Sequence, residues 1–414
     1  MKLKLIKAQK GTKDILPQDI PNWQKMEQAA LETFSAANFK EIRTPIFEAT
    51  ELFARGVGDS TDIVNKEMYT FEKSDRSLTL RPENTAGVVR AFIENGFARM
   101  PQPVKLWYKG PMFRYERPQA GRQRQFHKVG VEMFGIYEPS ADAECINLAV
   151  TYLNKLGLND LDIEINSLGC RDCRTAYRNA IREVLKDELD NLCDDCKYRY
   201  EKNPLRILDC KNEDCQKIFQ KKEIQEVIYS DYICADCKAH YEQLKEYLTA
   251  LSIPYKENKL LVRGLDYYNR TVFEIKSNNL GSQNAVCGGG RYDTLVETLG
   301  GVPTPAVGWA MGMERLNSLI PSAEVKYIDA FVVSENAVEA FKLVNDLRKH
   351  GFSVDFDYNK RKFVKQLEKA SKTARYALII MEDELKNNTI TVKNLINSEQ
   401  KTVSRNDILN ELKS

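Results

Sequence analysis

The stretch Lys109–Gly135, KGPMFRYERPQAGRQRQFHKVGVEMFG, decides how the rest of the chain is interpreted. Its first three residues form a Lys-Gly-Pro turn signal, and Met112–Tyr115 has the composition of a short strand. Phe126–Phe134 predicts a second strand, because it is rich in β-branched and aromatic residues. The polar loop between them contains Pro118–Gly121. We therefore expect a β-hairpin with alternating faces.

This hairpin is locally basic. From 114 to 128 five basic residues stand against one acid, Glu116, whereas the formal net charge of the whole chain is +2. The basic residues are Arg114, Arg117, Arg122, Arg124 and Lys128. Arginine suits paired hydrogen bonds to phosphate or carboxylate. A charged sheet edge that discourages strand pairing is the alternative, and composition alone does not decide between them.

Length, charge and cysteine content limit the class of protein. The 414 residues suffice for two or three domains. The nearly neutral charge excludes a histone-like polycation, so contacts with nucleic acid must come from local patches. We find no apolar run of membrane-spanning length and no apolar signal-peptide core at the N-terminus. Ten cysteines then predict reduced thiols or metal ligands in a cytoplasmic protein with no membrane partner.

The N-terminal region alternates helices and strands. Residues 21–38 predict an amphipathic helix, and 67–81 predict a hairpin. The apparent strand 39–47 contains Pro45, which indicates either an edge strand at a subunit boundary or a bulge in an ordinary sheet. Thr85 is the expected N-cap of a helix that runs to about Gly96. Glu83 suits the positive end of that helix and would equally suit the ammonium group of a ligand.

The remainder predicts further mixed structure. Residues 167–251 are charged, helical and rich in cysteine, and 321–326 are a linker. Before the linker we expect a helix at 140–158, strands at 161–166, 260–263 and 272–276, and a buried strand and helix at 306–319. After it, strands at 330–333, 353–356 and 376–381 alternate with helices, which predicts a small, mostly parallel α/β domain.

Four other segments carry unusual chemistry. They are the Arg81–Thr85 turn, Arg263–Glu274 (RGLDYYNRTVFE), Ala285–Asp293 (AVCGGGRYD) and Ala306–Leu316 (AVGWAMGMERL). Three consecutive glycines cost conformational entropy unless the backbone must approach a ligand or another strand closely. These segments therefore predict a binding site.

Together the five segments resemble the histidyl-tRNA synthetase family of class II aminoacyl-tRNA synthetases, over essentially the whole chain. The hairpin resembles motif 2, residues 39–45 resemble motif 1 with its interface proline, and VGWAMGMERL resembles motif 3. RGLDYYNRTVFE and CGGGRYD are similar to the two signatures of the histidine-specific enzymes.

The resemblance implies an α+β fold with a six-stranded antiparallel sheet flanked by helices. The catalytic domain would span 1–325, with a helical, Cys-rich insertion at about 167–251. An α/β anticodon-binding domain would span 326–414.

The resemblance also implies a reaction, which is ATP-dependent aminoacylation of tRNA(His) with L-histidine through a histidyl-adenylate. The expected protein is a homodimer that uses ATP with Mg²⁺. One alternative is a catalytically inactive paralogue that serves as a histidine-sensing regulatory subunit in histidine biosynthesis. Another is a tRNA- or zinc-binding accessory protein. The presence of Arg114, Arg263 and Arg315 favours the enzyme.

The family's functional residues are carried over position by position. By resemblance, Arg114 and Arg263 are catalytic groups on either side of the α-phosphate. The ATP-binding residues would be Arg114, Glu116, Arg122, Phe126 and Arg315, with Glu116 on the adenine amino group and Phe126 on the ring. Arg117 and Gln119 would face the tRNA acceptor end.

The implied histidine-binding residues are Glu83, Thr85, Arg114, Lys128, Glu132, Arg263, Tyr267, Tyr268 and Tyr292. Glu132 and Tyr268 would bind the imidazole, which discriminates roughly 10⁴-fold against other side chains and makes an editing domain unnecessary. Three positions depart from the family, namely Asn84, Lys128 and Thr294. Lys128 matters most, because an ammonium group there would repel the ammonium group of the substrate.

The insertion contains Cys170-x₂-Cys173, Cys193-x₂-Cys196, Cys210-x₄-Cys215 and Cys234-x₂-Cys237. Two paired thiols of this spacing are typical of a structural zinc site. The preferred ligand set is Cys193, Cys196, Cys234 and Cys237, with Cys210 and Cys215 as substitutes. Spacing alone does not distinguish zinc from reduced, non-ligating thiols.

A basic helix is expected in the C-terminal domain. From 360 to 375 seven basic residues face one acid, Glu368. Phe363, Val364, Leu367 and Ala370 would form its buried stripe. The outward lysines would bind tRNA phosphates or form an ordinary solvated face.

Overall fold

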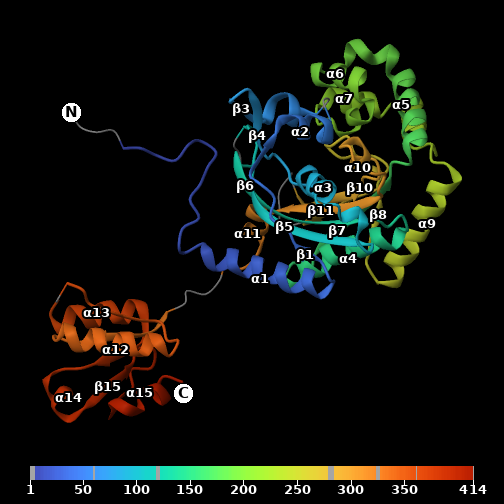
Figure 1. The fold of residues 1–414 in the computed structure, drawn as a ribbon. Helices are drawn as coiled ribbons and strands as arrows, with labels where there is room; N and C mark the ends of the chain where they lie inside the picture. The colour runs from blue at the N-terminus through green and yellow to red at the C-terminus, as the bar shows by residue number, and fades with distance from the viewer. Residues whose placement is uncertain are drawn as a thin grey trace. The chain divides into compact units, whose positions relative to one another are not determined.

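The computed structural model describes residues 5–58, 61–117, 122–277, 284–322, 327–359 and 361–413. The chain forms two compact units, 1–322 and 323–414, so the division falls beside the boundary expected at 325 (Figure 1). Pro118–Gly121, with Gln119, and Lys360 lie outside the described residues. Within the described ranges, none of the helices has the length and apolar character needed to cross a bilayer.

The first unit is built on an eight-stranded sheet. Its order is β1-β5-β6-β11-β10-β9-β7-β8. The strands are β1 (Lys40–Glu41), β5 (Val104–Phe113), β6 (Gln125–Phe134), β11 (Ala306–Gly312), β10 (Ala285–Arg291), β9 (Asn269–Ser277), β7 (Leu161–Ser167) and β8 (Lys256–Glu257). At the two edges, the two-residue strands β1 and β8 pair in parallel with β5 and β7, respectively. The six strands between them are antiparallel to their neighbours in that group. The expected six-stranded antiparallel sheet is therefore confirmed.

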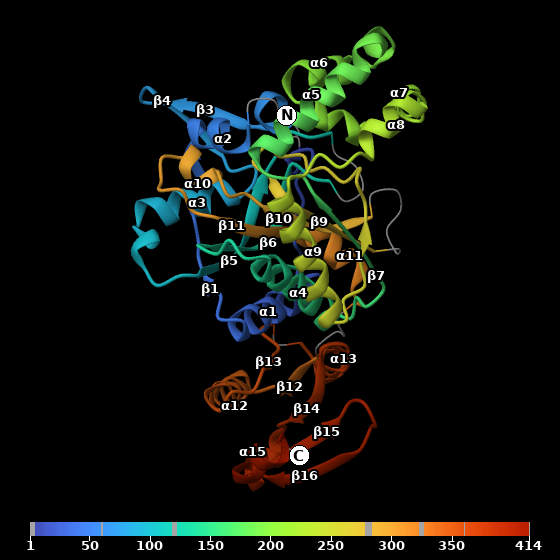
Figure 2. The same ribbon diagram turned by 90° about the vertical axis from the view of Figure 1, so that its right-hand side faces the viewer.

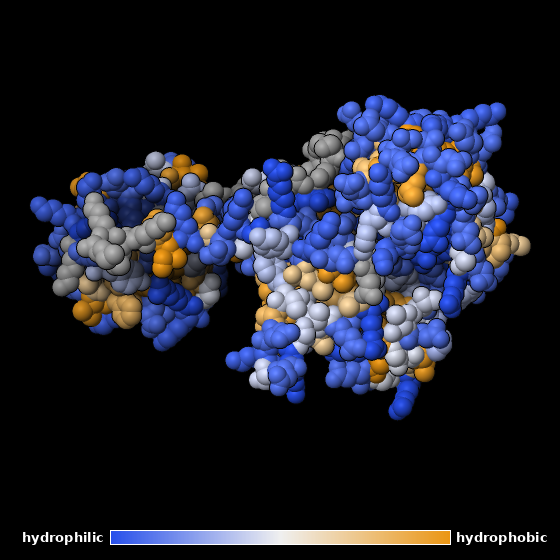
Figure 3. Space-filling view, turned by 90° about the horizontal axis from the view of Figure 1, so that it is seen from above, coloured by the Kyte–Doolittle hydropathy of each residue, from blue (hydrophilic) through white to orange (hydrophobic). Residues whose placement is uncertain are grey.

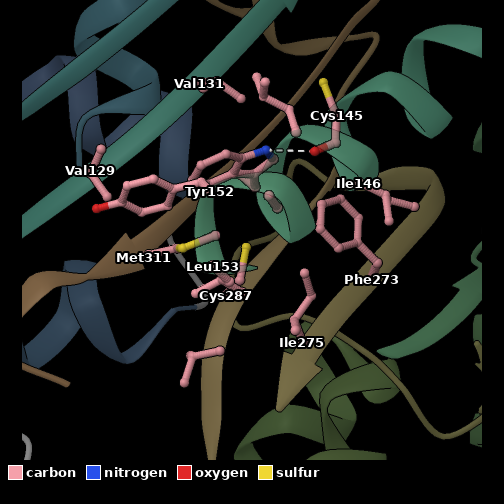
Figure 4. Close-up of a cluster of buried hydrophobic side chains, with 14 of the residues drawn as sticks. Val129, Val131, Cys145, Ile146, Tyr152, Leu153, Phe273, Ile275, Cys287 and Met311 are labelled. Atoms are coloured by element: carbon pink, nitrogen blue, oxygen red, sulfur yellow. Dashed lines mark hydrogen bonds between the residues drawn. The ribbon is translucent and has the colours of Figure 1, made fainter. Parts of the chain in front are cut away.

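Helices cover both faces of this sheet (Figure 2). The helices α1 (Ile20–Ala36), α4 (Pro139–Lys155), α9 (Ala235–Ala250) and α11 (Met313–Leu319) pack on one face. On the other face lie α3 (Thr85–Glu94) and α10 (Leu295–Thr298). Figure 4 shows part of the first core, where the indole N–H of Trp309 donates to the carbonyl oxygen of Cys145 at 2.8 Å. This bond satisfies the polar atom of a buried tryptophan.

Two predicted strands are wrong. Residues 39–47 do not form one strand, because only β1 joins the main sheet and Phe47–Ala49 (β2) joins β4 (Arg76–Leu80) and β3 (Tyr69–Lys73) in a separate sheet. Pro45 lacks an N–H group, and the Arg81 side chain bonds the Thr44 carbonyl oxygen at 3.0 Å. Residues 260–263 form a loop, in which the Asn258 side chain accepts the Leu260 N–H at 3.0 Å. This local turn replaces strand pairing.

The insertion has its own hydrophobic core. Its helices are α5 (Arg171–Leu185), α6 (Asp194–Lys202), α7 (Glu213–Phe219), α8 (Lys222–Ile228) and α9. In Figures 1 and 2, α5, α6 and α7 gather at one end of the first unit, beside α2 (Thr50–Val57). Arg199 and Arg206 of the insertion lie 3.6 and 3.4 Å from Asp62, which follows α2. Charged contacts therefore connect the insertion to the N-terminal region.

The second unit contains a five-stranded sheet of order β13-β12-β14-β15-β16. Its elements are β12 (Ile328–Val333), α12 (Ala337–Lys349), β13 (Val354–Phe356), α13 (Phe363–Thr373), β14 (Ala374–Ile379), α14 (Glu382–Asn387), β15 (Thr389–Asn394), β16 (Gln400–Ser404) and α15 (Ile408–Glu411). The first three strands are parallel, as predicted, and β15 and β16 add antiparallel pairs.

The buried stripe of α13 was partly mispredicted. Val364 is 71% exposed, whereas Gln366 is buried. The Gln366 side chain accepts the Ser334 N–H at 3.0 Å and donates to the Ser334 carbonyl oxygen at 2.9 Å. A polar residue takes the core position because both ends of its amide are hydrogen-bonded.

Across the face in Figure 3, hydrophilic side chains predominate, with hydrophobic patches between them.

Candidate active site

Two cavities meet at a positively charged junction in the first unit. The smaller has a volume of about 190 Å³ and the larger about 440 Å³. The residues that line both are Arg114, Lys128, Arg263, Gly264, Gly288 and Ala310. Lys128, Gly288 and Ala310 lie on β6, β10 and β11, while Arg114 follows β5. The sheet therefore brings segments distant in sequence to one point.

Gly288 makes room for Arg263 at this junction. A Cβ atom at position 288 would overlap the Nη2 atom of Arg263. The Arg263 side chain also donates a hydrogen bond to the carboxylate of Glu274 on β9. Burial by itself lowers the pKa of Arg263, but the Glu274 carboxylate outweighs it and raises that pKa. Arg263 therefore remains a cation. The predicted close approach of the glycine run to another strand occurs at Gly289, where a Cβ atom would overlap the Gly308 carbonyl oxygen.

The larger cavity is lined by all five predicted ATP-binding residues. Arg114 and Arg122 approach the Glu116 carboxylate, with N–O distances of 3.7 and 3.1 Å. The guanidinium carbon of Arg114 lies 5.6 Å from the centroid of the Phe126 ring. Burial, with the positive charge of Arg122, lowers the pKa of Arg315. Arginines gathered on one cavity wall are the arrangement that a polyanion stabilises.

The smaller cavity is lined by acidic, hydroxyl and aromatic groups. These include Glu83, Thr85, Tyr108, Tyr267 and Tyr268. The Glu83 carboxylate accepts the N–H groups of Thr85 and Ala86 at 2.8 and 2.9 Å. The expected N-cap at Thr85 is therefore wrong, because the helix begins at Thr85 and the preceding carboxylate caps it. The same carboxylate lies on the cavity wall.

Glu132 and Tyr292 lie behind this wall and do not line it. The Glu132 carboxylate accepts hydrogen bonds from the hydroxyl of Thr85, at 2.7 Å, and from that of Tyr292. A Cβ atom at Gly308 would overlap the Glu132 carboxylate, so the glycine makes room for it. Burial raises the pKa of Glu132 to about 8. At neutral pH the free protein therefore holds a proton on this carboxyl group.

Lys128 is half-buried at the junction. Its ammonium nitrogen lies 5.9 Å from the centroid of the Phe126 ring. Burial and the positive charge of Arg114 lower the pKa of Lys128 to about 7, with Glu83 acting in the opposite direction. A large fraction of the molecules thus carry a neutral amine at neutral pH. The expected repulsion of a substrate ammonium group is correspondingly weaker.

The other two departures from the family pattern lie away from the cavity walls. The side-chain oxygen of Asn84 accepts hydrogen bonds from Thr44 at 2.6 Å and from Arg81 at 3.3 Å. Asn84 thus connects the segment before β2 to α3. Thr294 is exposed just before α10. Neither residue lines the two cavities.

Sequence analysis missed several cavity residues, three of which are polar groups from unexpected segments. Tyr108 lines the smaller cavity, and Asp209 and Lys211 of the insertion line the larger one. Tyr108 precedes the opening hairpin by one residue and has only the pattern of a core strand. Asp209 and Lys211 flank Cys210, which was the one available signal. Their position depends on how the insertion folds.

The predicted zinc ligands are divided between two clusters. Cys193 and Cys196 lie with Cys210 and Cys215, whereas Cys234 and Cys237 lie with Cys170 and Cys173. The preferred set of four is therefore not brought together. Spacing identifies residues within one turn of chain, but tertiary folding decides which pairs meet.

Comparisons with known proteins cover almost the whole chain. A sequence model of the family described as Histidyl-tRNA synthetase matches residues 11–316, and one described as Anticodon binding domain matches 329–414. A protein of Caldanaerobacter subterraneus subsp. tengcongensis named Histidine–tRNA ligase is 47% identical over 99% of this chain and 100% of its own length. One of Clostridioides difficile with the same name is 48% identical over 99% of both.

Solved structures give the same family. The apo histidyl-tRNA synthetase of S. aureus matches with a TM-score of 0.82 and 38% identity, over 99% of this chain and 100% of that chain. A Bacillus halodurans C structure titled as an ATP phosphoribosyltransferase regulatory subunit/histidyl-tRNA synthetase matches with a TM-score of 0.68 over 92% and 99%. Its identity is 22%, so this match concerns the fold alone.

Proposed function

The chain belongs to the histidyl-tRNA synthetase family, and from this premise we propose that its smaller cavity binds histidine and its larger cavity binds ATP. The protein catalyses the ATP-dependent attachment of L-histidine to tRNA(His). The regulatory-subunit alternative is not favoured, because full-length relatives at 47 and 48% identity are ligases.

One observation carries the assignment of catalytic roles, which is that Arg114 and Arg263 line both cavities. The histidine carboxylate and the α-phosphate would meet between these two guanidinium groups. A carboxylate oxygen forms a bond to the α-phosphorus, and the bond from that phosphorus to the bridging oxygen breaks. Pyrophosphate leaves with the electron pair. The two arginines reduce the repulsion between the anions and stabilise the charge of the transition state.

The same arrangement assigns the ATP contacts. Arg122 and Arg315 would hold the γ-phosphate. Phe126 would stack on the adenine ring, and Glu116 would accept a hydrogen bond from the adenine amino group. In the free protein Glu116 lies beside Arg114 and Arg122, so ATP exchanges these ion pairs for phosphate contacts. Mg²⁺ would arrive with ATP and neutralise phosphate charge. Glu274 on the cavity wall would supply an oxygen ligand of the kind that Mg²⁺ prefers.

The smaller cavity accounts for recognition of histidine. Glu83 and Thr85 would bind the ammonium group, while Tyr268 and Glu132 would bind the imidazole beside Tyr267. Because Glu132 lies behind the cavity wall in the free protein, bonded to Thr85 and Tyr292, contact with the imidazole requires a rearrangement of that wall. With a pKa of about 8, Glu132 brings the proton that it shares with a neutral imidazole.

Binding of tRNA and dimerisation complete the proposal. Arg117 would reach the acceptor end, and the exposed lysines of α13 would contact phosphates of the anticodon region.

Three large apolar side chains at β2 and β3 are exposed, as expected for a homodimer interface there. Ile46, Phe47 and Phe71 are 44, 54 and 44% exposed. Sedimentation equilibrium should give twice the chain mass; a monomer at enzymatic concentrations contradicts the dimer. The insertion's cysteines are proposed ligands of structural zinc.

Histidine-dependent ATP–pyrophosphate exchange tests the assignment. Arg263→Ala should lose roughly 100-fold or more of this activity while the melting temperature hardly changes, because Arg263 acts on the transition state. Arg55→Ala is the matched control, since Arg55 lies on α2 in an exposed pair with Glu51. Full activity of Arg263→Ala contradicts its catalytic role. Absence of exchange from folded wild-type protein contradicts the proposed function itself.

A further inference from the structure

Eight of the ten cysteines form two compact clusters in the insertion. The first cluster is Cys170, Cys173, Cys234 and Cys237, and the second is Cys193, Cys196, Cys210 and Cys215. Within each cluster all four sulfur atoms lie within 4.8 Å of one another. Two separate sets of four thiols are thus brought together by the fold.

The sulfur–sulfur distances match tetrahedral zinc. They are 3.4 Å for Cys170–Cys173 and 4.0 Å for Cys173–Cys237 in the first cluster, and 3.8 Å for Cys193–Cys210 in the second. Zinc bound to four thiolates at about 2.3 Å places the sulfur atoms about 3.8 Å apart. A disulfide requires about 2.05 Å, and all of these cysteines are free thiols.

Backbone N–H groups point at the sulfur atoms of each cluster. In the first, Cys170 donates to the sulfur of Cys237 and Cys234 donates to that of Cys173, both at 3.1 Å. This arrangement is reciprocal between the two Cys-x₂-Cys pairs. In the second, Cys193 donates to the sulfur of Cys215 at 3.3 Å. Hydrogen bonds of this kind stabilise the thiolate, which is the form that binds metal.

Three helix N-termini provide further stabilisation of thiolates. Cys170, Cys193 and Cys234 are the N-cap residues of α5, α6 and α9, and their partners three residues later lie in the first turn of each helix. None of the three makes a side-chain capping bond. Cysteine is not a favoured N-cap residue, so capping does not explain these positions. The partial positive charge at a helix N-terminus does favour a thiolate.

We propose that each cluster binds one zinc ion through four thiolates, so that the insertion contains two structural zinc sites. Each site uses all four tetrahedral positions for cysteine, which leaves none for substrate or water. Binding releases the thiol protons and connects α5 to α9 in the first site and α6 to α7 in the second. The two ions therefore stabilise the insertion and take no part in the chemistry.

Each site lies next to a segment of the active site. Gly169, beside the first cluster, accepts the Arg270 N–H at 2.8 Å, and Arg174 of α5 donates to the Asp266 carbonyl oxygen at 3.1 Å. The loop between Asp266 and Arg270 carries both Tyr267 and Tyr268. The first zinc ion thus anchors the base of the insertion to the histidine-binding loop.

The second site holds part of the larger cavity wall. Cys210 separates Asp209 from Lys211, and both flanking residues line that cavity. Fixing Cys210 on zinc would therefore fix the backbone from which Lys211 extends toward the cavity that Arg122 and Arg315 also line. This consequence rests on the proposed binding of ATP in the larger cavity, whereas the two zinc sites do not.

Metal analysis of the full-length protein, purified with a thiol reductant and without chelator, tests the proposal. We expect two zinc ions per chain by inductively coupled plasma mass spectrometry. The double variants Cys170→Ser/Cys234→Ser and Cys193→Ser/Cys210→Ser should each retain one. Cys145→Ala is the matched control, because Cys145 is buried in the main core and should leave both ions bound.

A second measurement on the wild-type protein avoids variants that fail to fold. An organic mercurial that reacts with thiols should release two zinc ions, detected with a colorimetric zinc indicator, as eight cluster thiols react. Folded protein with less than about a tenth of an equivalent of zinc overturns the proposal, as does iron in its place. Zinc content does not depend on catalysis, so lack of pyrophosphate exchange with two zinc ions bound would contradict the proposed function only.

Discussion

The protonation of Lys128 should control how tightly the free protein binds histidine. Burial and the neighbouring Arg114 lower the pKa of this lysine from 10.5 to about 7. The charged form therefore predominates below about pH 7, and about nine tenths of the molecules carry it at pH 6 against about one tenth at pH 8. In the proposed binding mode, the ammonium group of histidine would bind on the same cavity wall. Only the neutral lysine accommodates it without repulsion.

This titration gives a magnitude. If the charged form is excluded from binding, the affinity of wild-type protein falls roughly tenfold between about pH 8 and pH 6 from Lys128 alone. Lys128→Gln removes the titrating amine and with it this part of the pH dependence. The variant should therefore bind histidine about as tightly as wild type at pH 8 and roughly tenfold more tightly at pH 6.

Isothermal titration calorimetry without ATP is the assay, because phosphates at the junction would stabilise the ammonium form. The imidazole of histidine and the carboxyl group of Glu132 also titrate in this range, but they do so in both proteins. The ratio of the two dissociation constants therefore isolates Lys128. Lys155→Gln, which removes a remote lysine paired with Glu32, should follow wild type. An unchanged ratio at both pH values would show that the charge of Lys128 does not reach the substrate.

Three other predictions test separate parts of the site. The raised pKa of Glu132 means that stability falls as pH rises from about 4.5 through 8, so the melting temperature of Glu132→Gln should decline less steeply over that range; parallel curves contradict a buried protonated carboxyl group. Gly288→Ala should displace Arg263 and lower pyrophosphate exchange by roughly 100-fold, like loss of the arginine itself; wild-type activity would show that Arg263 has another productive position. Lys211→Ala should raise the KM for ATP severalfold and leave the KM for histidine unchanged; equal effects on both would argue for general disruption of the insertion.

The sequence predicted those parts of the fold that depend on local pattern. The strands predicted at 126–134 and 272–276 are recognisable because each contacts a hydrophobic core on at least one face. The segment 260–263 has the same composition, but the side chain of Asn258 turns the chain before pairing begins. The resemblance singled out Arg114 and Arg263, and both line the two cavities. It could not show that Glu132 lies behind Thr85, because that depends on side-chain hydrogen bonds.

The grouping of the cysteines likewise could not be predicted from local sequence. Spacing identified each Cys-x₂-Cys pair, since residues three apart at the start of a helix face one another. The choice of partner pair requires the path of the chain through α5, α6 and α9, which no local pattern contains. Cys170 and Cys234 are 64 positions apart in sequence, yet both lie in the first cluster.

The positions of the Arg263 and Glu132 side chains depend on glycines in two neighbouring strands. On β10, Gly288 leaves space for the Arg263 guanidinium, and on β11, Gly308 leaves space for the Glu132 carboxylate. Gly308 is paired with both Gly290 and Glu132, so the space for the carboxylate lies directly across the strand pair from the residue that uses it. A Cβ atom at Gly288 or Gly308 would overlap the side chain that occupies this space, so any larger residue there would displace that side chain. Gly288 and Gly308 therefore contribute to the site through the space that they leave, even though none of their atoms need touch a reacting group.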